Sequence, residues 1–402
     1  MDKIKKDKLF TGDYMCIMAA NFLLYFGFFL LLPIIPFYLA ETFGADKAVI
    51  GVVLSIYTVA SLFMRSCSGY LVDTFARKPL YLFAYFTFTA MFFGYIVAFT
   101  LTMFAILRFV HGLAFGLVTV SGSTIAIDIM PSSRRGEGIG YFGLTGNIAM
   151  SIGPMCGLFM HDHGHSFVVI FASALVSCLL GFILASLVRT RPKPKVEKQV
   201  ISLDRFFLLK GVNGSISLLL LAVPYGITTS YIAMYFLQMG ISGNGGLYFT
   251  LMALGMAVTR LFSGKRVDKG FVTETIKVGL WPALACFVLL AADGYVAAVD
   301  KGAATALFYA AAVLHGIGFG IIFPAYNSLF INLGRNDQRG TANSTYLTSW
   351  DVGIGIGVFS GGYIAEYFSF EVTYMFGCML VLIAIAFFYL RVTPHYKKHK
   401  LR

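Results

Sequence analysis

Charged residues are scarce in this sequence. Only 12% of its 402 residues are Asp, Glu, Lys or Arg, whereas 58% are hydrophobic and 40 are phenylalanine. A soluble domain carries about 25% charged residues, so this chain cannot cover its surface with groups that water solvates. The composition excludes an ordinary soluble protein and indicates a chain surrounded by lipid.

Motifs of catalysis, cofactor binding and metal binding are also missing. There is no Walker loop, no Rossmann fingerprint and no Ser-x-x-Lys, and we expect no His-x-x-x-His metal pair in a helix. The six cysteines show no Cys-x-x-Cys spacing. The histidine-rich stretch at 161–165 could bind a divalent metal, but a solvated loop is the simpler interpretation. We expect no enzyme activity, no cofactor and no metal.

Long apolar runs dominate what remains. A membrane-spanning helix needs about 20 mainly apolar residues to cross the hydrocarbon core, and backbone groups in lipid must bond internally, which selects helices. Such runs occur at 14–40, 49–72, 80–99, 102–128, 138–160, 166–188, 212–238, 246–267, 275–297, 303–331, 341–363 and 370–391. The sequence therefore predicts an all-α membrane protein with twelve transmembrane helices.

The distribution of Lys and Arg predicts the orientation, because cytoplasmic loops are enriched in these residues. Of the 31 Lys and Arg residues, 26 lie in alternate loops and the two termini, and only Lys47 and Lys301 lie in the opposite loops. We therefore expect both termini in the cytoplasm and several passes through the inner (plasma) membrane. The net charge of +12 is spread over these loops, which speaks against nucleic-acid binding.

The chain also repeats itself. The segment 111–116, His-Gly-Leu-Ala-Phe-Gly, matches 315–320, His-Gly-Ile-Gly-Phe-Gly, and the same offset relates Arg135-Gly136 to Arg339-Gly340. Because the spans repeat after six, the two halves are parallel repeats. This pattern predicts two six-helix bundles, at 1–188 and 211–402, joined by a basic cytoplasmic linker at 189–210.

Three motifs carry a resemblance to a known family. The loop at 69–78 has Gly69 followed by Asp73, Arg77 and Lys78; Arg108 and Gly112 stand in the fourth span; and the fifth span contains Gly146, Gly153, Pro154 and Gly157. These resemble the signature motifs of the major facilitator superfamily, and the last resembles that of its drug/proton antiporter-like, twelve-helix exporter branch. The family loop usually has Gly where this chain has Ala76.

The resemblance implies a secondary active transporter that works as a monomer by alternating access. It implies proton-coupled efflux of a small amphipathic or drug-like organic molecule. A sugar or metabolite exporter or importer of the same fold is the alternative, and a membrane enzyme or a receptor is a third. Within the loop, the resemblance implies that Asp73 and Arg77 act as a cytoplasmic latch, which Asp128 could join; solvated orientation signals are the alternative.

The glycines of the fifth span, at 146, 153 and 157, lie on one stripe of a helix and allow close packing. Pro154 removes a backbone donor and can bend the helix. Packing alone explains this motif, whereas the resemblance adds a helix that bends or seals during transport.

Charges inside a membrane are functional candidates because they are costly there. Arg108 shares a helix face with His111, and could either extend to the outer interface or take part in substrate or proton chemistry. Asp351, beside Trp350, has the neutral Asn147 as its repeat mate. Asp351 could carry a proton, pair with a cationic substrate or be a satisfied structural acid.

Many relatives with this Arg have an acid in the first helix, where this chain has Asn21 and, one turn later, Tyr25. That absence shifts the expected coupling role to Asp351 and His111. The sequence also suggests that Tyr57, Tyr225, Tyr231, Tyr235 and Trp350 face a substrate cavity.

Overall fold

The computed structural model describes residues 8–131, 134–190, 207–241, 243–335 and 338–401. Every regular element in this part of the chain is a helix. The first half contains α1 (Gly12–Leu31), α2 (Ile34–Phe43), α3 (Lys47–Thr74), α4 (Arg77–Val97), α5 (Leu101–Ile129), α6 (Arg135–Asp162) and α7 (Phe167–Leu187). The predicted all-α fold is confirmed.

The second half begins with a short 3-10 turn, η3 (Leu209–Gly211). It continues with α8 (Val212–Met239), α9 (Gly246–Asp268), α10 (Val272–Ala297), α11 (Lys301–Leu333), α12 (Arg339–Tyr367) and α13 (Phe370–Phe387). A π-helical turn, η5 (Phe388–Val392), connects α13 to α14 (Thr393–His399).

Local chemistry sets several helix ends. Thr100 caps α5 by accepting a hydrogen bond from the Met103 amide at 3.1 Å, and Asp300 caps α11 through the amides of Gly302 and Ala303. A side-chain oxygen at this position bonds donors that the helix itself leaves unpaired. At the C-terminal end of α8, Gly240 adopts φ 58°, a left-handed conformation that favours glycine.

Eleven of the described helices are long and apolar enough to span a membrane. Helix α12 has 29 residues and covers the remaining predicted span, 341–363. The predicted span 14–40 is interrupted, because α1 ends at Leu31 and α2 begins at Ile34. Pro33 lies in this break, and proline has no amide hydrogen to donate to a continuous helix.

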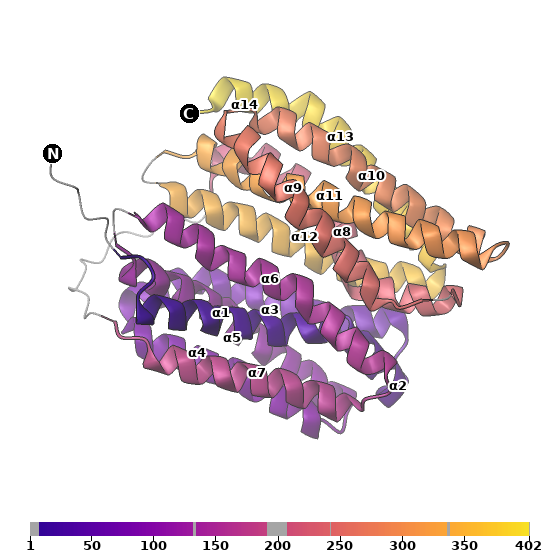
Figure 1. Ribbon diagram of the computed structural model, residues 1–402, viewed down its shortest axis with the longest axis horizontal. Helices are drawn as coiled ribbons and strands as arrows, with labels where there is room; N and C mark the ends of the chain where they lie inside the picture. The colour runs from indigo at the N-terminus through magenta and orange to yellow at the C-terminus, as the bar shows by residue number, and fades with distance from the viewer. Residues whose placement is uncertain (1–7, 132–133, 191–206, 242, 336–337, 402) are drawn as a thin grey trace. The chain divides into compact units, whose positions relative to one another are not determined.

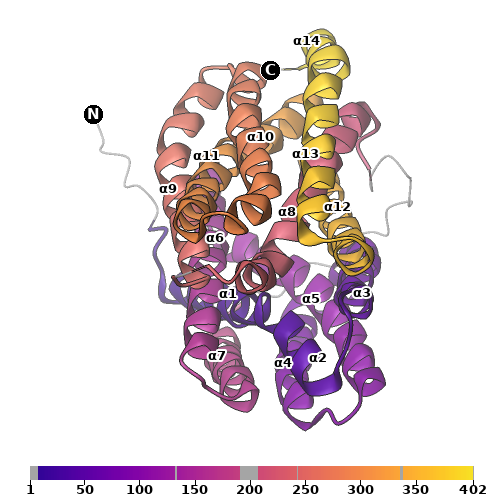
Figure 2. The same cartoon turned by 90° about the vertical axis from the view of Figure 1, so that its right-hand side faces the viewer.

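The chain groups into two compact units. Unit 1 comprises Met1–Ile34 and Val59–Lys198, and unit 2 comprises Ile35–Thr58 and Gln199–Arg402. In unit 1, α1 packs on α6 and α7, and α4 packs on α5. In unit 2, α8 lies along α12 (Figure 1) and α10 lies beside both α11 and α13 (Figure 2).

Residues 35–58, which comprise most of α2 and the start of α3, group with unit 2 because the start of α3 packs closely on α12. The Lys47 amide donates to Glu366 at 2.9 Å, and a Cβ added at Gly362 would collide with the Lys47 carbonyl oxygen. The boundaries 1–188 and 211–402 stay a prediction, and most of the linker lies outside the described residues.

Candidate functional site

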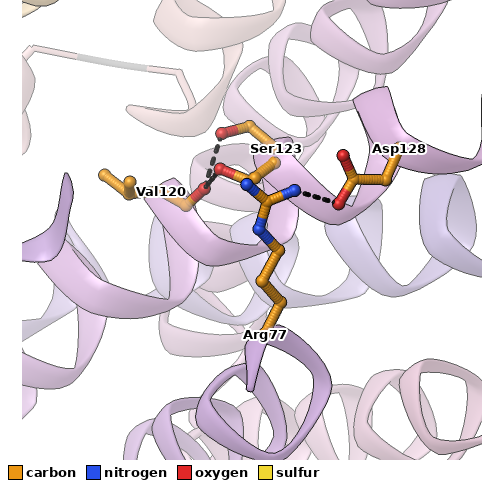
Figure 3. Close-up of polar contacts among 5 residues, drawn as sticks. Arg77, Val120, Ser123 and Asp128 are labelled. Carbon is orange, nitrogen blue, oxygen red and sulfur yellow. Dashed lines mark hydrogen bonds and ion pairs between the residues drawn. The ribbon is translucent and has the colours of Figure 1, made fainter. Parts of the chain in front are cut away.

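The loop between α3 and α4 brings one predicted pair of charges together. Arg77 is the first residue of α4 and Asp128 lies one residue before the end of α5; Arg77 Nη1 and Asp128 Oδ2 form an ion pair within unit 1. Figure 3 shows the Arg77 side chain reaching Asp128 near Ser123, whose hydroxyl donates to Val120 O at 2.9 Å. The pair joins the cytoplasmic ends expected for α4 and α5.

The rest of this loop is placed only in part. Lys78 Nζ donates to Ser186 O of α7 at 2.9 Å, which ties the start of α4 to α7. Gly69 and the side chain of Asp73 lie outside what the structure describes. The latch therefore stays a prediction, for which the Arg77–Asp128 pair supplies the geometry.

A buried polar cluster connects α4 and α5. Arg108 and His111 are 2% and 1% exposed. The Tyr95 hydroxyl lies 2.6 Å from His111 Nδ1 and also interacts with the Arg108 guanidinium. The rings of Phe88 and Phe92 lie 4.3 and 4.8 Å from the imidazole ring, centre to centre. Arg108 therefore turns into unit 1, and His111 lies in an aromatic cage.

The polar residues of α1 face α6. Asn21 Nδ2 donates to Thr145 Oγ1 at 2.8 Å, and the Tyr25 ring meets Phe115 of α5 edge-on at 5.8 Å. A Cβ added at Gly146 would lie 3.4 Å from the Tyr25 ring. The side chain of Asn147 lies outside the described residues.

The glycine motif of α6 packs directly on α1. A Cβ added at Gly157 would collide with Leu30 O, and one at Gly153 would lie 2.9 Å from the Leu30 amide nitrogen. Pro154 is buried inside α6. The repeat recurs in unit 2, where an added Cβ at Gly357 of α12 would collide with Val223 O of α8. Backbone contact between these helices thus depends on glycine in both units.

Asp351 lies beside an aromatic cluster in unit 2. The Trp350 ring packs 4.4 Å from Phe323 and 4.8 Å from Tyr225, centre to centre. Tyr346 interacts electrostatically with Asp351 and with Arg260 of α9, and Arg260 also interacts with Tyr225. We call the six residues Tyr225, Arg260, Phe323, Tyr346, Trp350 and Asp351 the α12 cluster. It combines flat apolar faces with one acid and one base, which suits an amphipathic ligand that bears a charge.

Two tyrosines that the sequence suggested for a cavity have structural partners instead. Tyr231 is fully buried and its hydroxyl donates to Val358 O at 2.9 Å. Tyr235 is fully buried and its hydroxyl donates to Leu290 O at 3.0 Å. Both hydroxyls bond to the backbone of neighbouring helices of unit 2, so the expectation that they face a cavity is wrong for the conformation described.

Sequence reasoning missed one acid and one histidine pair. Asp293, near the end of α10, is fully buried; its place only four residues before the helix end concealed it. His395 and His399 form a His-x-x-x-His pair in α14, beyond the last apolar run, and their rings stack at 4.2 Å. Among the described residues no three His, Cys, Asp or Glu come together in a way that could hold a metal.

The sequence comparison decides the family. The family model of the major facilitator superfamily matches residues 17–300 and 277–402. The chain belongs to the major facilitator superfamily. It is therefore a membrane transporter and not an enzyme, and it resembles the drug/proton antiporter-like branch.

Relatives and solved structures agree with this assignment. The quinolone resistance protein NorA of Staphylococcus aureus is 24% identical over 345 residues, which cover 81% of this chain and 83% of NorA. An uncharacterised MFS-type transporter of Methanocaldococcus jannaschii is 26% identical over 90% of this chain and 93% of its own length. A D-xylose–proton symporter structure matches 97% of this chain and 99% of its own, with a TM-score of 0.75 at 17% identity, which shows the shared fold.

Proposed function

We propose that this transporter exports a small amphipathic organic molecule in exchange for protons, by alternating access between its two halves. The similarity to NorA, named for quinolone resistance, supports a drug-like substrate. The glycine contacts of α6 on α1 and of α12 on α8 support a shared mode of packing in which one helix can shift against the other. We further propose that it acts as a monomer in the plasma membrane with both termini in the cytoplasm.

The observation that carries the proposal is the position of Asp351 in the α12 cluster. A carboxylate beside Tyr346, which also interacts with Arg260, can change its charge when a proton binds. The neighbouring Trp350 and Tyr225 offer aromatic faces to a ligand. Proton binding and substrate binding would then compete for the same acid, which is one way to link their movements. Asp351 acts either as the proton carrier or as the counter-ion of a cationic substrate.

The contacts of the remaining candidate site residues suggest two different roles. Asn21 and Tyr25 link α1 to α5 and α6, so they would shape the binding surface of unit 1. Arg108 and His111 would hold a positive charge at a fixed depth in that unit, with Tyr95 as their link. We therefore assign substrate contact to the α12 cluster. We assign to the buried polar cluster of Tyr95, Arg108 and His111 the task of holding a positive charge in place in unit 1.

An efflux screen in cells tests the proposal. Cells that express the protein are loaded with a panel of quinolones, cationic dyes, sugars and nucleosides, and efflux is followed with and without an uncoupler. We expect efflux of at least one quinolone or dye, and we expect the uncoupler to abolish it. Efflux confined to sugars or nucleosides would support the alternative substrate class. Efflux that an uncoupler leaves unchanged would contradict proton coupling.

A further inference from the structure

Asp293 of α10 is the one acidic side chain that is buried among the residues the structure describes. It is 0% exposed, and neither carboxylate oxygen has a hydrogen-bond partner in the described part of the chain. An ionised carboxylate in such surroundings loses its hydration without compensation, at a cost of several kcal/mol. A bound proton removes that cost.

The helical turn that carries Asp293 is held by a side chain from another helix. The Tyr235 hydroxyl of α8 donates to Leu290 O at 3.0 Å and accepts from the Gly294 amide at 2.7 Å. Leu290 and Gly294 are four residues apart, so these are the two groups that an α-helix would join to each other. A side chain inserted into the hydrogen-bond ladder marks a place where a helix can bend, and this place lies beside Asp293.

A cavity of about 350 Å³ opens next to this turn. Its lining consists of Gln238, Met239, Gly294, Ala297, Ala298, Lys301 and Glu371. A Cβ added at Gly294 would collide with the Glu371 carboxylate, so the glycine allows that carboxylate to lie against α10 one residue from Asp293. Glu371 is half-buried and Lys301 is exposed. Water can therefore approach within one residue of the buried acid.

The groups around Asp293 suit a proton rather than a metal ion. Tyr235 of α8 and Tyr374 of α13 both interact electrostatically with Asp293, and Glu371 of α13 and Tyr295 of α10 act on Tyr235. Helix α9 contributes Tyr248, which interacts with Tyr374. Asp300 caps the start of α11 and Lys301 is its first residue. A hard cation requires six or more oxygen ligands, whereas a proton requires one carboxylate.

We propose that Asp293 is a proton-binding site of unit 2, distinct from Asp351 and loaded through the cavity that Glu371 lines. The Asp293 carboxylate takes one proton from water in the cavity, with Glu371 as the intermediate acceptor, and returns it by the same route. Loosening of the turn that Tyr235 holds opens the last step of this route. A part in transport additionally rests on the proton coupling proposed above.

Infrared spectroscopy of the purified full-length protein, without substrate, tests the site directly. The wild type should show the C=O band of a protonated carboxylic acid, and this band should disappear reversibly as pH is raised. Asp293→Asn should lack the band and Asp351→Asn should retain it. A band that is unchanged in Asp293→Asn, or that persists at every pH at which the wild type stays folded, would overturn the proposal. If Asp293→Asn does not fold, Asp293→Leu takes its place, and the wild-type titration stands by itself.

Hydrogen–deuterium exchange of the same band tests the route. Ala298→Trp fills the cavity and should slow the exchange, whereas Ala292→Trp, at an exposed position of α10 outside the cavity lining, should not. Equal exchange in the two variants would overturn loading through the cavity. Efflux insensitive to an uncoupler, together with a titrating Asp293 band, would defeat the proposed function and leave the site standing, so the two failures can be told apart.

Discussion

The Tyr95 hydroxyl lies 2.6 Å from Nδ1 of His111 in unit 1. The repeat mate of His111, His315, has the same kind of bond in unit 2, where the Tyr248 hydroxyl lies 3.0 Å from its Nδ1. The two tyrosines come from helices that the repeat does not relate, since Tyr95 lies on the third span and Tyr248 on the eighth. Both units keep the histidine and complete its hydrogen bond from different directions, which favours a structural role for Nδ1.

Replacing Tyr95 by Phe should destabilise the protein by about 1–3 kcal/mol, because a buried nitrogen loses its hydrogen-bond partner. The melting temperature of the purified protein in detergent measures this. Tyr248→Phe should lower it to a similar extent, whereas Tyr141→Phe, at an exposed position of α6, should leave it unchanged. A wild-type melting temperature for Tyr95→Phe would show that the bond does not hold unit 1 together.

Glycine at position 157 should be required for the packing of α6 on α1. The Cβ of Gly157→Ala collides with Leu30 O, and overpacking of this kind costs about 1–3 kcal/mol. Gly143→Ala on the same helix is the matched control, because nothing lies within 4 Å of its added Cβ. We expect Gly157→Ala to melt at a lower temperature and Gly143→Ala to match or exceed the wild type. Equal melting of the two variants would contradict the close contact.

The sequence predicted the architecture because its determinants are local. Runs of apolar residues marked the helices, and the paired glycines at 153 and 357 marked the tight crossings that both units contain. The break after Leu31 was hidden, since Pro33 and Pro36 occur in a run whose apolar character never lapses. Whether proline interrupts a helix depends on neighbouring contacts as well as on its own chemistry.

Side-chain direction limited the prediction of the site. Hydropathy could not show that Tyr235 reaches across to the backbone of α10, or that Asp293 turns inward while its neighbour Ala292 is exposed. Both depend on the rotation of α10 against α8 and α13, which the sequence pattern of an almost wholly apolar helix does not specify. By contrast, the pairing of Arg77 with Asp128 could be anticipated, because opposite charges at adjacent helix ends have few other partners near the membrane surface.

Exchanging the charges of Arg77 and Asp128 tests whether the ion pair matters for transport. A surface ion pair contributes only about 0.2–1 kcal/mol to stability; the Asp128 side chain is 42% exposed and that of Arg77 13%. Arg77→Asp and Asp128→Arg alone should therefore insert and fold but transport poorly, and the double variant should recover efflux if attraction is what counts. Lys78→Asp provides the control for a simple change of loop charge. Wild-type efflux by both single variants would remove the pair from the mechanism.

Asp73→Asn should also weaken efflux strongly while leaving insertion intact, because one loop charge is lost and no apolar span changes. Efflux measured against the amount of protein in the membrane separates the two effects. Normal efflux by correctly inserted Asp73→Asn would exclude Asp73 from the latch.

Asp351→Asn should separate substrate movement from proton movement. The amide matches the shape of the acid but cannot change its charge, so the variant should bind substrate and exchange it across a vesicle membrane without a gradient. It should fail to accumulate substrate against a concentration difference when a pH gradient is applied. Loss of binding itself would indicate a counter-ion for a cationic substrate. Accumulation at the wild-type level would rule out both roles.

Proton movement driven by substrate tests the central claim most directly. Wild-type protein is reconstituted into vesicles that hold a pH-sensitive dye, the membrane potential is clamped, and a substrate identified in the efflux screen is added outside. Exchange of substrate for protons predicts that the lumen becomes more alkaline as substrate enters, and that vesicles without the protein show no change. Entry of substrate through the protein with a constant lumenal pH would contradict proton-coupled transport.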